Sequence, residues 1–192
     1  HELDLASVTL TGAQLQGATL TSAHLEYAQL QGADLSQADL RGAHLSEAQL
    51  QNATLAFTKL IAAQLNMANL SSAQLEGADL SDVVAHGAHF ARLNATGSSW
   101  RGARLSGCYW EGANLERADW SHTRVEGGVW RDLKLSGLKL IEASISDADW
   151  SRAELEGLEG LGVNLSRVNL TGANLKRARL SDSHLESCDL TN

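Results

Sequence analysis

The sequence predicts an all-β fold in which the chain winds into a square coil. Three observations support this prediction. Leucine recurs at every fifth position, alanine lies two residues before most of these leucines, and none of the 192 residues is proline. The stretch GADLSQADLRGAHLSEAQL shows the pattern clearly, with its leucines at Leu35, Leu40, Leu45 and Leu50.

The five-residue repeat continues through the whole chain without insertion or deletion. Of the 38 positions divisible by five, 27 hold leucine and five hold tryptophan, and these are called centre positions below. Alanine occupies the position two before the centre at 22 of 38 sites, and 15 of the 17 glycines lie two after it. The positions directly before and after the centre are mostly polar, so each repeat carries two apolar sites.

Neither a helix nor a flat strand buries this pattern on one face. Five residues of helix rotate the chain by about 500°, which would spread the leucines around the axis. On a flat strand, successive leucines would alternate between faces, because five is an odd number. If the alanine and the centre residue both point inward and the chain then bends by about 90°, four bends close a coil of twenty residues. Such coils stack at the strand spacing of about 4.8 Å.

The remaining composition fits these bends. Glycine tolerates a positive φ, and Asn, Asp, Ser and Thr bond to the nearby backbone, so both kinds of residue suit the corners. Proline would remove a hydrogen bond between coils, and its absence is consistent with the coil.

Five repeats, ADLSQ, ADLRG, ADLSD, ANLER and ANLKR, match the pattern A(D/N)LXX of the pentapeptide-repeat proteins, and the chain resembles this family from Leu3 to Leu190. The resemblance implies a right-handed quadrilateral β-helix of about nine to ten coils, without substantial helix. We expect residues 1–192 to form a single domain. Because the chain begins at His1 rather than methionine, we expect it to be a fragment of a larger protein.

The twenty-residue coil predicts which centre side chains stack. The aromatic centre residues are expected to fill the core rather than to bind a cofactor, and each buried indole N–H then requires a partner. The expected aromatic core comprises Phe90, Trp110, Trp130 and Trp150 in one column, and Trp100 and Trp120 in the opposite column.

No metal site and no disulfide are predicted. His24 and His44 lie one coil apart, so both could contact one ion, but their neighbours in that column are an aspartate and a glutamine, and we find no third ligand there. Cys108 and Cys188 are four coils apart, about 19 Å, which is beyond the reach of a disulfide.

No arrangement of catalytic residues stands out. Asp147 with Asp149, and Glu154 with Glu156, are interpreted as surface charges rather than acid–base pairs. The segment GLEGLG, from Gly157 to Gly162, lacks the lysine and the following helix of a phosphate-binding loop, and we expect a local bulge or bend there. We therefore predict that the chain is not an enzyme and uses no cofactor.

Composition limits the partners. The net charge of −8 disfavours direct binding to nucleic acid, which requires a basic surface. No apolar run approaches the roughly 18 residues needed to cross a bilayer, and no signal peptide is visible, so membrane insertion is not predicted. The compartment stays open between the bacterial cytoplasm and secretion.

Stacked apolar residues on the outside of the coil indicate a protein partner. Tyr109 and Val129 lie above His89 in one column, and Ile141 and Leu161 lie on adjacent coils in another. Contiguous exposed apolar surface is typical of interaction sites, so these five residues form the predicted partner patch. A further exposed set at the bends comprises Tyr27, Phe57 and Met67.

Two functions agree with these observations. The resemblance implies a rigid, non-catalytic interaction scaffold with an unidentified protein partner. We expect it to be a domain of a larger bacterial protein, such as a secreted effector or a secretion-system accessory protein. Both chain ends continue the repeat without a cap, so either further chain covers the open edges or rods associate end to end. The alternative is a DNA mimic that binds DNA gyrase and confers quinolone-type resistance.

Charge density argues against the alternative. A rod of about 45 Å would have to imitate about 26 charges of duplex DNA. This chain has a net charge of −8, and 13 of its 15 basic residues lie from Arg92 onward. The final residues, LESCDLTN, continue the repeat and provide no dimerisation helix.

Overall fold

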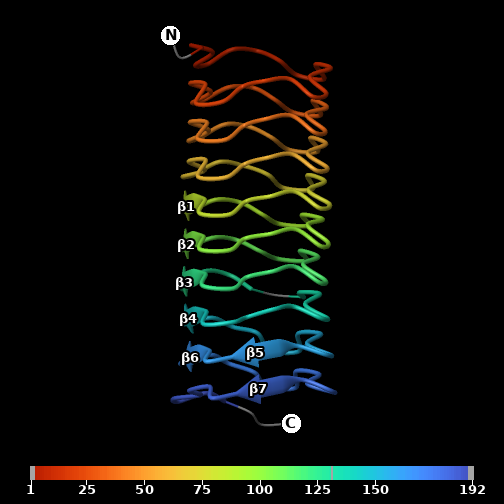
Figure 1. The fold of residues 1–192 in the computed structure, drawn as a ribbon. Coiled ribbons are helices and arrows are strands. Elements are labelled where there is room, and N and C mark those ends of the chain that lie inside the picture. The colour runs from red at the N-terminus through yellow and green to blue at the C-terminus, as the bar shows by residue number, and fades with distance from the viewer. Residues whose placement is uncertain (1–2, 131, 190–192) are drawn as a thin grey trace.

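The chain winds into a narrow stack of coils, with the two termini at opposite ends (Figure 1). The computed structural model describes residues 3–130 and 132–189. Its β-bridges join residues twenty positions apart in parallel, from Asp4 with His24 at one end to Asn169 with Asp189 at the other. No helix occurs within the described ranges. The all-β quadrilateral coil predicted from the repeat is therefore confirmed.

Seven short strands lie in the C-terminal part of the stack. They are β1 (Val84–His86), β2 (Arg104–Ser106), β3 (Arg124–Glu126), β4 (Ser144–Ser146), β5 (Glu159–Leu161), β6 (Asn164–Ser166) and β7 (Arg179–Ser181). Strands β1, β2, β3, β4 and β6 form one parallel sheet, called the five-strand face, and β5 pairs with β7 on the adjacent side, called the β5–β7 face. Regular strands thus mark about five turns, fewer than the nine to ten coils expected, because the other coils pair through isolated bridges.

Backbone hydrogen bonds connect each coil to the next and close each bend. The Leu35 N–H donates to the carbonyl of Thr54 (2.8 Å), and the Thr54 N–H donates to the carbonyl of Ala33 (2.9 Å). At the following bend, the Ala38 N–H donates to the carbonyl of Leu35 (2.9 Å). Since these donors recur in every repeat, a proline at any of them would leave a carbonyl without its partner.

The aspartate or asparagine before many centre residues has a local structural role. The N–H directly after the centre has no backbone partner in the coil, and this side chain accepts its hydrogen bond. Asp34 Oδ1 accepts from the Ser36 N–H, Asn69 Oδ1 from the Ser71 N–H, and Asp79 Oδ1 from the Ser81 N–H, each at 3.0 Å. This is the Asx-turn geometry of short polar side chains, and it explains the A(D/N)L pattern.

The interior is filled by the two apolar positions of each repeat. Leu35, Leu40, Leu45 and Leu50 are at most 1% exposed. The aromatic rings stack along the axis, with ring centroids 4.3 Å apart for Phe90 and Trp110 and 5.2 Å apart for Trp110 and Trp130. The same burial applies to all five tryptophans, Trp100, Trp110, Trp120, Trp130 and Trp150.

The indole N–H groups are only partly satisfied. Trp100 Nε1 donates to Ser98 Oγ (2.7 Å), and Trp130 Nε1 donates to the carbonyl of Gly127 (2.8 Å). The indole nitrogens of Trp110, Trp120 and Trp150 have no hydrogen-bond partner among the described residues. The expectation of a partner for each indole is therefore wrong at these three, and packing area must outweigh the cost of the unpaired donors.

No bulge occurs at GLEGLG, and the turn at Gly157 and the bend at Gly162 are regular corners of the coil. Gly160 lies in the middle of strand β5 and pairs in register with Leu180 of β7. A Cβ on Gly160 would lie 2.6 Å from Leu180 Cδ2 and 2.9 Å from Val163 Cγ2. Neighbouring side chains therefore fill the space of the missing centre residue, and the coil continues without a break.

Gly128 interrupts the repeat for a different reason. It stands two before the centre residue Trp130, where alanine is the commonest residue, but its φ is +104°. A Cβ there would lie 2.5 Å from the carbonyl oxygen of Cys108. The backbone of the preceding coil thus comes too close for any side chain.

We expect Gly128→Ala to destabilise the protein by about 2 kcal/mol or more, although it restores the common residue, because it adds backbone strain and a steric clash. Urea unfolding followed by circular dichroism measures the change. Gly97→Ala is the matched control, since Gly97 also has a positive φ (+66°) but open space around the added Cβ. We expect it to lose about 1 kcal/mol, and equal losses would contradict the clash.

Candidate functional site

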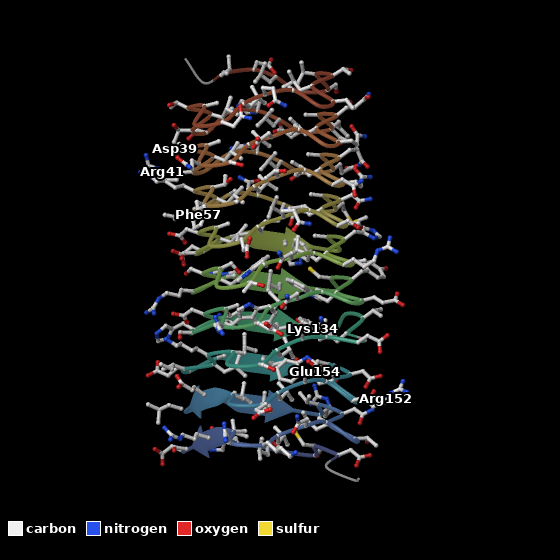
Figure 2. The ribbon with its side chains drawn as sticks, turned by 90° about the vertical axis from the view of Figure 1, so that its right-hand side faces the viewer. Asp39, Arg41, Phe57, Lys134, Arg152 and Glu154 are labelled. Atoms are coloured by element: carbon white, nitrogen blue, oxygen red, sulfur yellow. The ribbon has the colours of Figure 1, made fainter. Side chains whose placement is uncertain are left out.

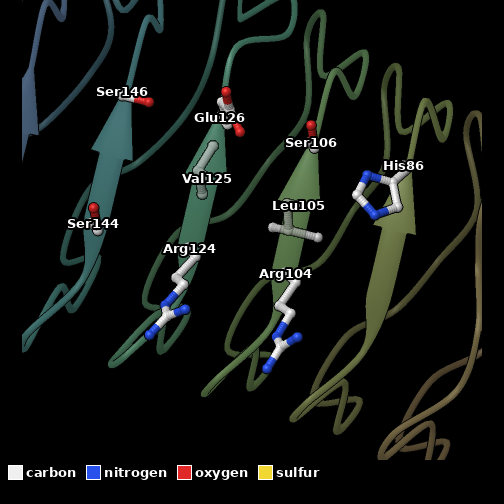
Figure 3. Close-up of a pocket in the computed structure, with 9 residues that line it drawn as sticks. All are labelled: His86, Arg104, Leu105, Ser106, Arg124, Val125, Glu126, Ser144 and Ser146. Carbon is white, nitrogen blue, oxygen red and sulfur yellow. The ribbon is translucent and has the colours of Figure 1, made fainter.

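A shallow groove of about 290 Å³ runs across strands β1 to β4 on the five-strand face (Figure 3). Its floor contains the centre residues Leu105 and Val125, and polar side chains border it. The complete lining is His86, Arg104, Leu105, Ser106, Arg124, Val125, Glu126, Ser144 and Ser146. This groove was not predicted from the sequence, in which two arginines twenty residues apart are the signal for it.

The groove separates charge along its strands. Arg104 and Arg124 are paired in register on β2 and β3, and Figure 3 shows their guanidinium groups side by side at one end of these strands. Glu126 and Ser106 lie at the other end. Two positive charges on adjacent strands repel each other unless an anion lies between or above them.

Neither arginine has an ion-pair partner among the residues that the structure describes. Some other arginines on the rod form ion pairs. Arg41 makes a bidentate contact with Asp39 (2.8 and 2.6 Å; Figure 2), and Arg167 makes one with Asp147 (2.7 and 2.8 Å). The Arg41 guanidinium accordingly lowers the pKa of the Asp39 carboxyl. Arg92, Arg117, Arg152 and Arg179 also have no ion-pair partner among the described residues. The groove arginines are instead distinguished by their in-register pairing on adjacent strands.

The predicted partner patch is divided between two sides of the coil. The rings of His89 and Tyr109 are stacked, with centroids 4.6 Å apart, and Val129 follows in the same column of bridges. Ile141 and Leu161 lie on the β5–β7 face, half a coil away in sequence from that column and therefore on the opposite side of the rod. Four of these side chains are exposed, but one flat partner surface cannot contact both clusters.

The exposed apolar residues at the bends lean along the rod. Phe57 projects from the edge of the stack (Figure 2), and its ring lies over Gly77 one coil further on, within 2.6 Å of the position of a Cβ. The sulfur of Met67 covers Gly87 in the same way. These side chains therefore pack locally against the glycine of the next coil.

The carboxylate pairs considered for acid–base chemistry are engaged elsewhere. Hydrogen bonds from Arg167 lower the pKa of Asp147. Asp149 accepts hydrogen bonds from the Ser151 N–H (3.1 Å) and from Asn169 Nδ2 (2.9 Å). The backbone of Glu154 pairs with that of Lys134 on the preceding coil (Figure 2), and Glu156 Oε1 lies 3.9 Å from Arg177 Nη1.

The cysteines are free thiols. Cys108 is buried, and burial raises its pKa to about 11, so the thiol stays protonated near neutral pH. A protonated, enclosed thiol is a poor nucleophile. Cys108 Sγ instead donates a hydrogen bond to the carbonyl of Ala85 (3.3 Å).

One group of side chains has the composition of a metal site. His24, Glu26 and His44 each offer a donor atom, and these atoms lie within 4.8 Å of one another. The column of the two histidines contains no third ligand, and none was predicted from the sequence. That conclusion was wrong because Glu26, two residues after His24, points outward from the same face in the parallel column.

None of the described residues belongs to a helix that is long and apolar enough to cross a bilayer.

Comparisons with known proteins place this fold in a family. The family model for pentapeptide repeats matches eight copies within the chain. The matched residues are 2–37, 28–66, 68–99, 101–127 and 162–192. A comparison with curated proteins found no match.

Several solved structures are similar. HetL, a pentapeptide-repeat protein involved in the regulation of heterocyst differentiation in the cyanobacterium Nostoc sp. strain PCC 7120, is 25% identical, with a TM-score of 0.73 over 98% of this chain and 87% of HetL. A thylakoid-lumen pentapeptide-repeat protein of Arabidopsis thaliana is 32% identical over 46% of this chain and 66% of its own, with a TM-score of 0.41. QnrB1, a plasmid-mediated fluoroquinolone resistance protein, is 21% identical over 95% of this chain and 90% of its own, with a TM-score of 0.47.

Proposed function

Because this chain belongs to the pentapeptide-repeat family and carries an unpaired arginine groove, we propose that it acts as a rigid, non-catalytic scaffold that binds an acidic segment of a protein partner. The observation that carries the proposal is the in-register pair Arg104 and Arg124, which has no carboxylate partner among the described residues. The partner would supply that carboxylate.

An extended acidic segment fits the groove better than a small anion. The groove is open and shallow, and it runs over four coils of one face. Guanidinium groups bind carboxylates through two parallel hydrogen bonds, so two arginines one coil apart favour two acidic side chains on one segment. Ser106, Ser144 and Ser146 offer further hydrogen bonds along the floor.

The charge distribution along the rod supports this location. Residues 92–192 carry 14 acidic and 13 basic residues, so this half is almost neutral. The two groove arginines therefore act on a partner without a large opposing field. The exposed ring pair of His89 and Tyr109, with Val129, lies around the next bend from the groove and provides an apolar rim for the same partner.

Non-catalytic function is supported by what the described side chains do. The buried thiol of Cys108, whose pKa burial raises to about 11, is protonated near neutral pH, and Asp147 accepts hydrogen bonds from Arg167. In the groove, Ser106 lies in register between His86 and Glu126, but no hydrogen bond among the described residues joins its hydroxyl to either side chain, so the serine is not activated as a nucleophile.

We expect the rod to bind a fluorescent peptide rich in glutamate more tightly than the same peptide with glutamine, and to lose at least tenfold in affinity when both arginines are reversed in Arg104→Glu/Arg124→Glu. Fluorescence anisotropy at two salt concentrations measures this. The matched control, Lys134→Glu/Lys139→Glu, changes the net charge equally at exposed lysines outside the groove. Equal losses in both variants would show a general charge effect and contradict the groove.

The same binding measurement also tests the apolar rim formed by His89, Tyr109 and Val129. Tyr109→Glu/Val129→Glu should weaken a peptide that carries both acidic and aromatic residues and leave the purely acidic peptide unchanged. If the variant bound both peptides as tightly as the unchanged chain does, the rim would be excluded from the binding site. The groove itself is tested by the arginine variant.

The DNA-mimic alternative makes a different prediction, namely inhibition or protection of gyrase supercoiling by the purified rod. A DNA mimic requires a continuous acidic surface, whereas the groove presents two adjacent arginines. We expect no effect at micromolar protein, and a clear effect would favour the alternative over the scaffold.

A further inference from the structure

The side chains of His24, Glu26 and His44 form a second feature of the five-strand side, nearer the N-terminus and independent of the groove. His24 and His44 are bridge partners on adjacent coils, and their ring centroids are 4.7 Å apart. The carboxylate of Glu26 contacts both rings: its Oε1 is 3.2 Å from His24 Nδ1 and 3.4 Å from His44 Nδ1. Both imidazoles thus direct the same nitrogen toward one carboxylate oxygen.

From this arrangement we propose that His24, Glu26 and His44 bind a Zn²⁺ ion that links two adjacent coils. Two histidines and one carboxylate, with water in the fourth position, form a standard zinc ligand set. The sequence reason is simple: positions directly before and after a centre residue both point outward, so residues two apart in one coil and twenty apart between coils meet on one face.

The distances agree with this ion. Two ligands held tetrahedrally at about 2.0–2.1 Å from zinc are separated by about 3.3 Å. The two N–O separations here, 3.2 and 3.4 Å, bracket that value. A metal can therefore replace the hydrogen bonds of the cluster with little movement of the carboxylate.

The second oxygen of the carboxylate is also suited to a cation. Glu26 Oε2 is buried and has no hydrogen-bond partner among the described residues. An unpaired buried carboxylate oxygen is unfavourable, and a bound ion would compensate for it.

Ligand type and local charge select the ion. Imidazole nitrogens favour zinc and its transition-metal neighbours over Mg²⁺ and Ca²⁺, which prefer oxygen ligands. Residues 3–91 contain eight acidic and two basic residues, a net charge of −6, which attracts cations to this half of the rod. The side chains are about one third exposed (36%, 26% and 33%), so the ion can enter from solvent.

The test is isothermal titration of the untagged full chain with zinc chloride, with cobalt chloride and visible absorption as a second probe of tetrahedral geometry. We expect one zinc per chain and a rise in Tm of roughly 5–10 °C when free zinc is one hundred times its Kd. His24→Gln, His44→Gln and Glu26→Gln should each weaken binding at least tenfold and reduce the Tm rise.

His122→Gln is the matched control, because His122 also faces a carboxylate, with His122 Nδ1 3.3 Å from Glu142 Oε2, but belongs to no such three-residue group among the described residues. Its zinc affinity should equal that of the unchanged chain. Circular dichroism confirms that each variant is folded before titration. Two results would overturn the proposal. One is the absence of zinc binding at millimolar zinc, and the other is a zinc affinity of the His24→Gln and His44→Gln variants that equals that of the unchanged chain.

Discussion

Replacing Leu115 with aspartate is expected to destabilise the protein by about 4 kcal/mol or more and to prevent folding of the surrounding coils. Leu115 is completely buried, and its backbone is held by hydrogen bonds to the next coil (Leu115 N–H to the Lys134 carbonyl, 2.8 Å). The interior around it is apolar, so an aspartate would have neither water nor a cation. Urea unfolding followed by far-UV circular dichroism measures the loss.

The control for this prediction is Gln29→Glu on the outside of the rod. Gln29 is exposed, so the new charge stays in water, and we expect a change of about 0.5 kcal/mol or less. If both variants were equally stable, Leu115 would not lie in the interior. Leu115→Asn separates charge from polarity, and its loss should lie between the other two.

The second large effect is expected for Trp110→Ala, with a loss of about 3–5 kcal/mol. Trp110 is fully buried, and its ring contacts an aromatic ring on either side along the axis, Phe90 at 4.3 Å and Trp130 at 5.2 Å. The stacked coils are fixed by backbone hydrogen bonds to neighbours above and below, so they cannot collapse into the cavity. The same unfolding measurement applies.

A pair of conservative variants tests the role of the indole N–H groups. Trp110 Nε1 has no partner among the described residues, whereas Trp100 Nε1 donates to Ser98 Oγ. Trp100→Phe should therefore cost about 1 kcal/mol more than Trp110→Phe, because only the former breaks a buried hydrogen bond. A larger loss for Trp110→Phe would indicate that its N–H is paired.

The functional surfaces were less predictable than the fold. The stacking of Tyr109 on His89 was predicted from the twenty-residue coil. That Ile141 and Leu161 lie on the opposite side of the rod was not predicted, because it depends on which side of the square cross-section each column occupies. The arginine groove was missed because it depends on which carboxylates reach which arginines, as at Asp39 and Arg41. The proposed zinc ligands were not predicted because Glu26 lies outside the column of the two histidines.

Particular glycines show the same limit. The repeat predicts alanine at position 128 and leucine at position 160, and nothing in the sequence alone explains the two exceptions. In the structure, Gly128 is required by the approach of the Cys108 carbonyl, and the space at Gly160 is occupied by Leu180 and Val163. Both reasons lie in neighbours that are twenty or fewer residues away but on other coils or sides.

The sequence by itself determined the coil, its twenty-residue period and the residues that fill its interior, because neither a helix nor a flat strand would bury an apolar pattern of period five on one face. The tertiary structure alone decided which outward side chains pair, which arginines stay without a carboxylate, and that Glu26 joins two histidines. The physical reason is that outward side chains are free to rotate in water, so their partners are fixed by distances of a few ångströms that the repeat does not specify.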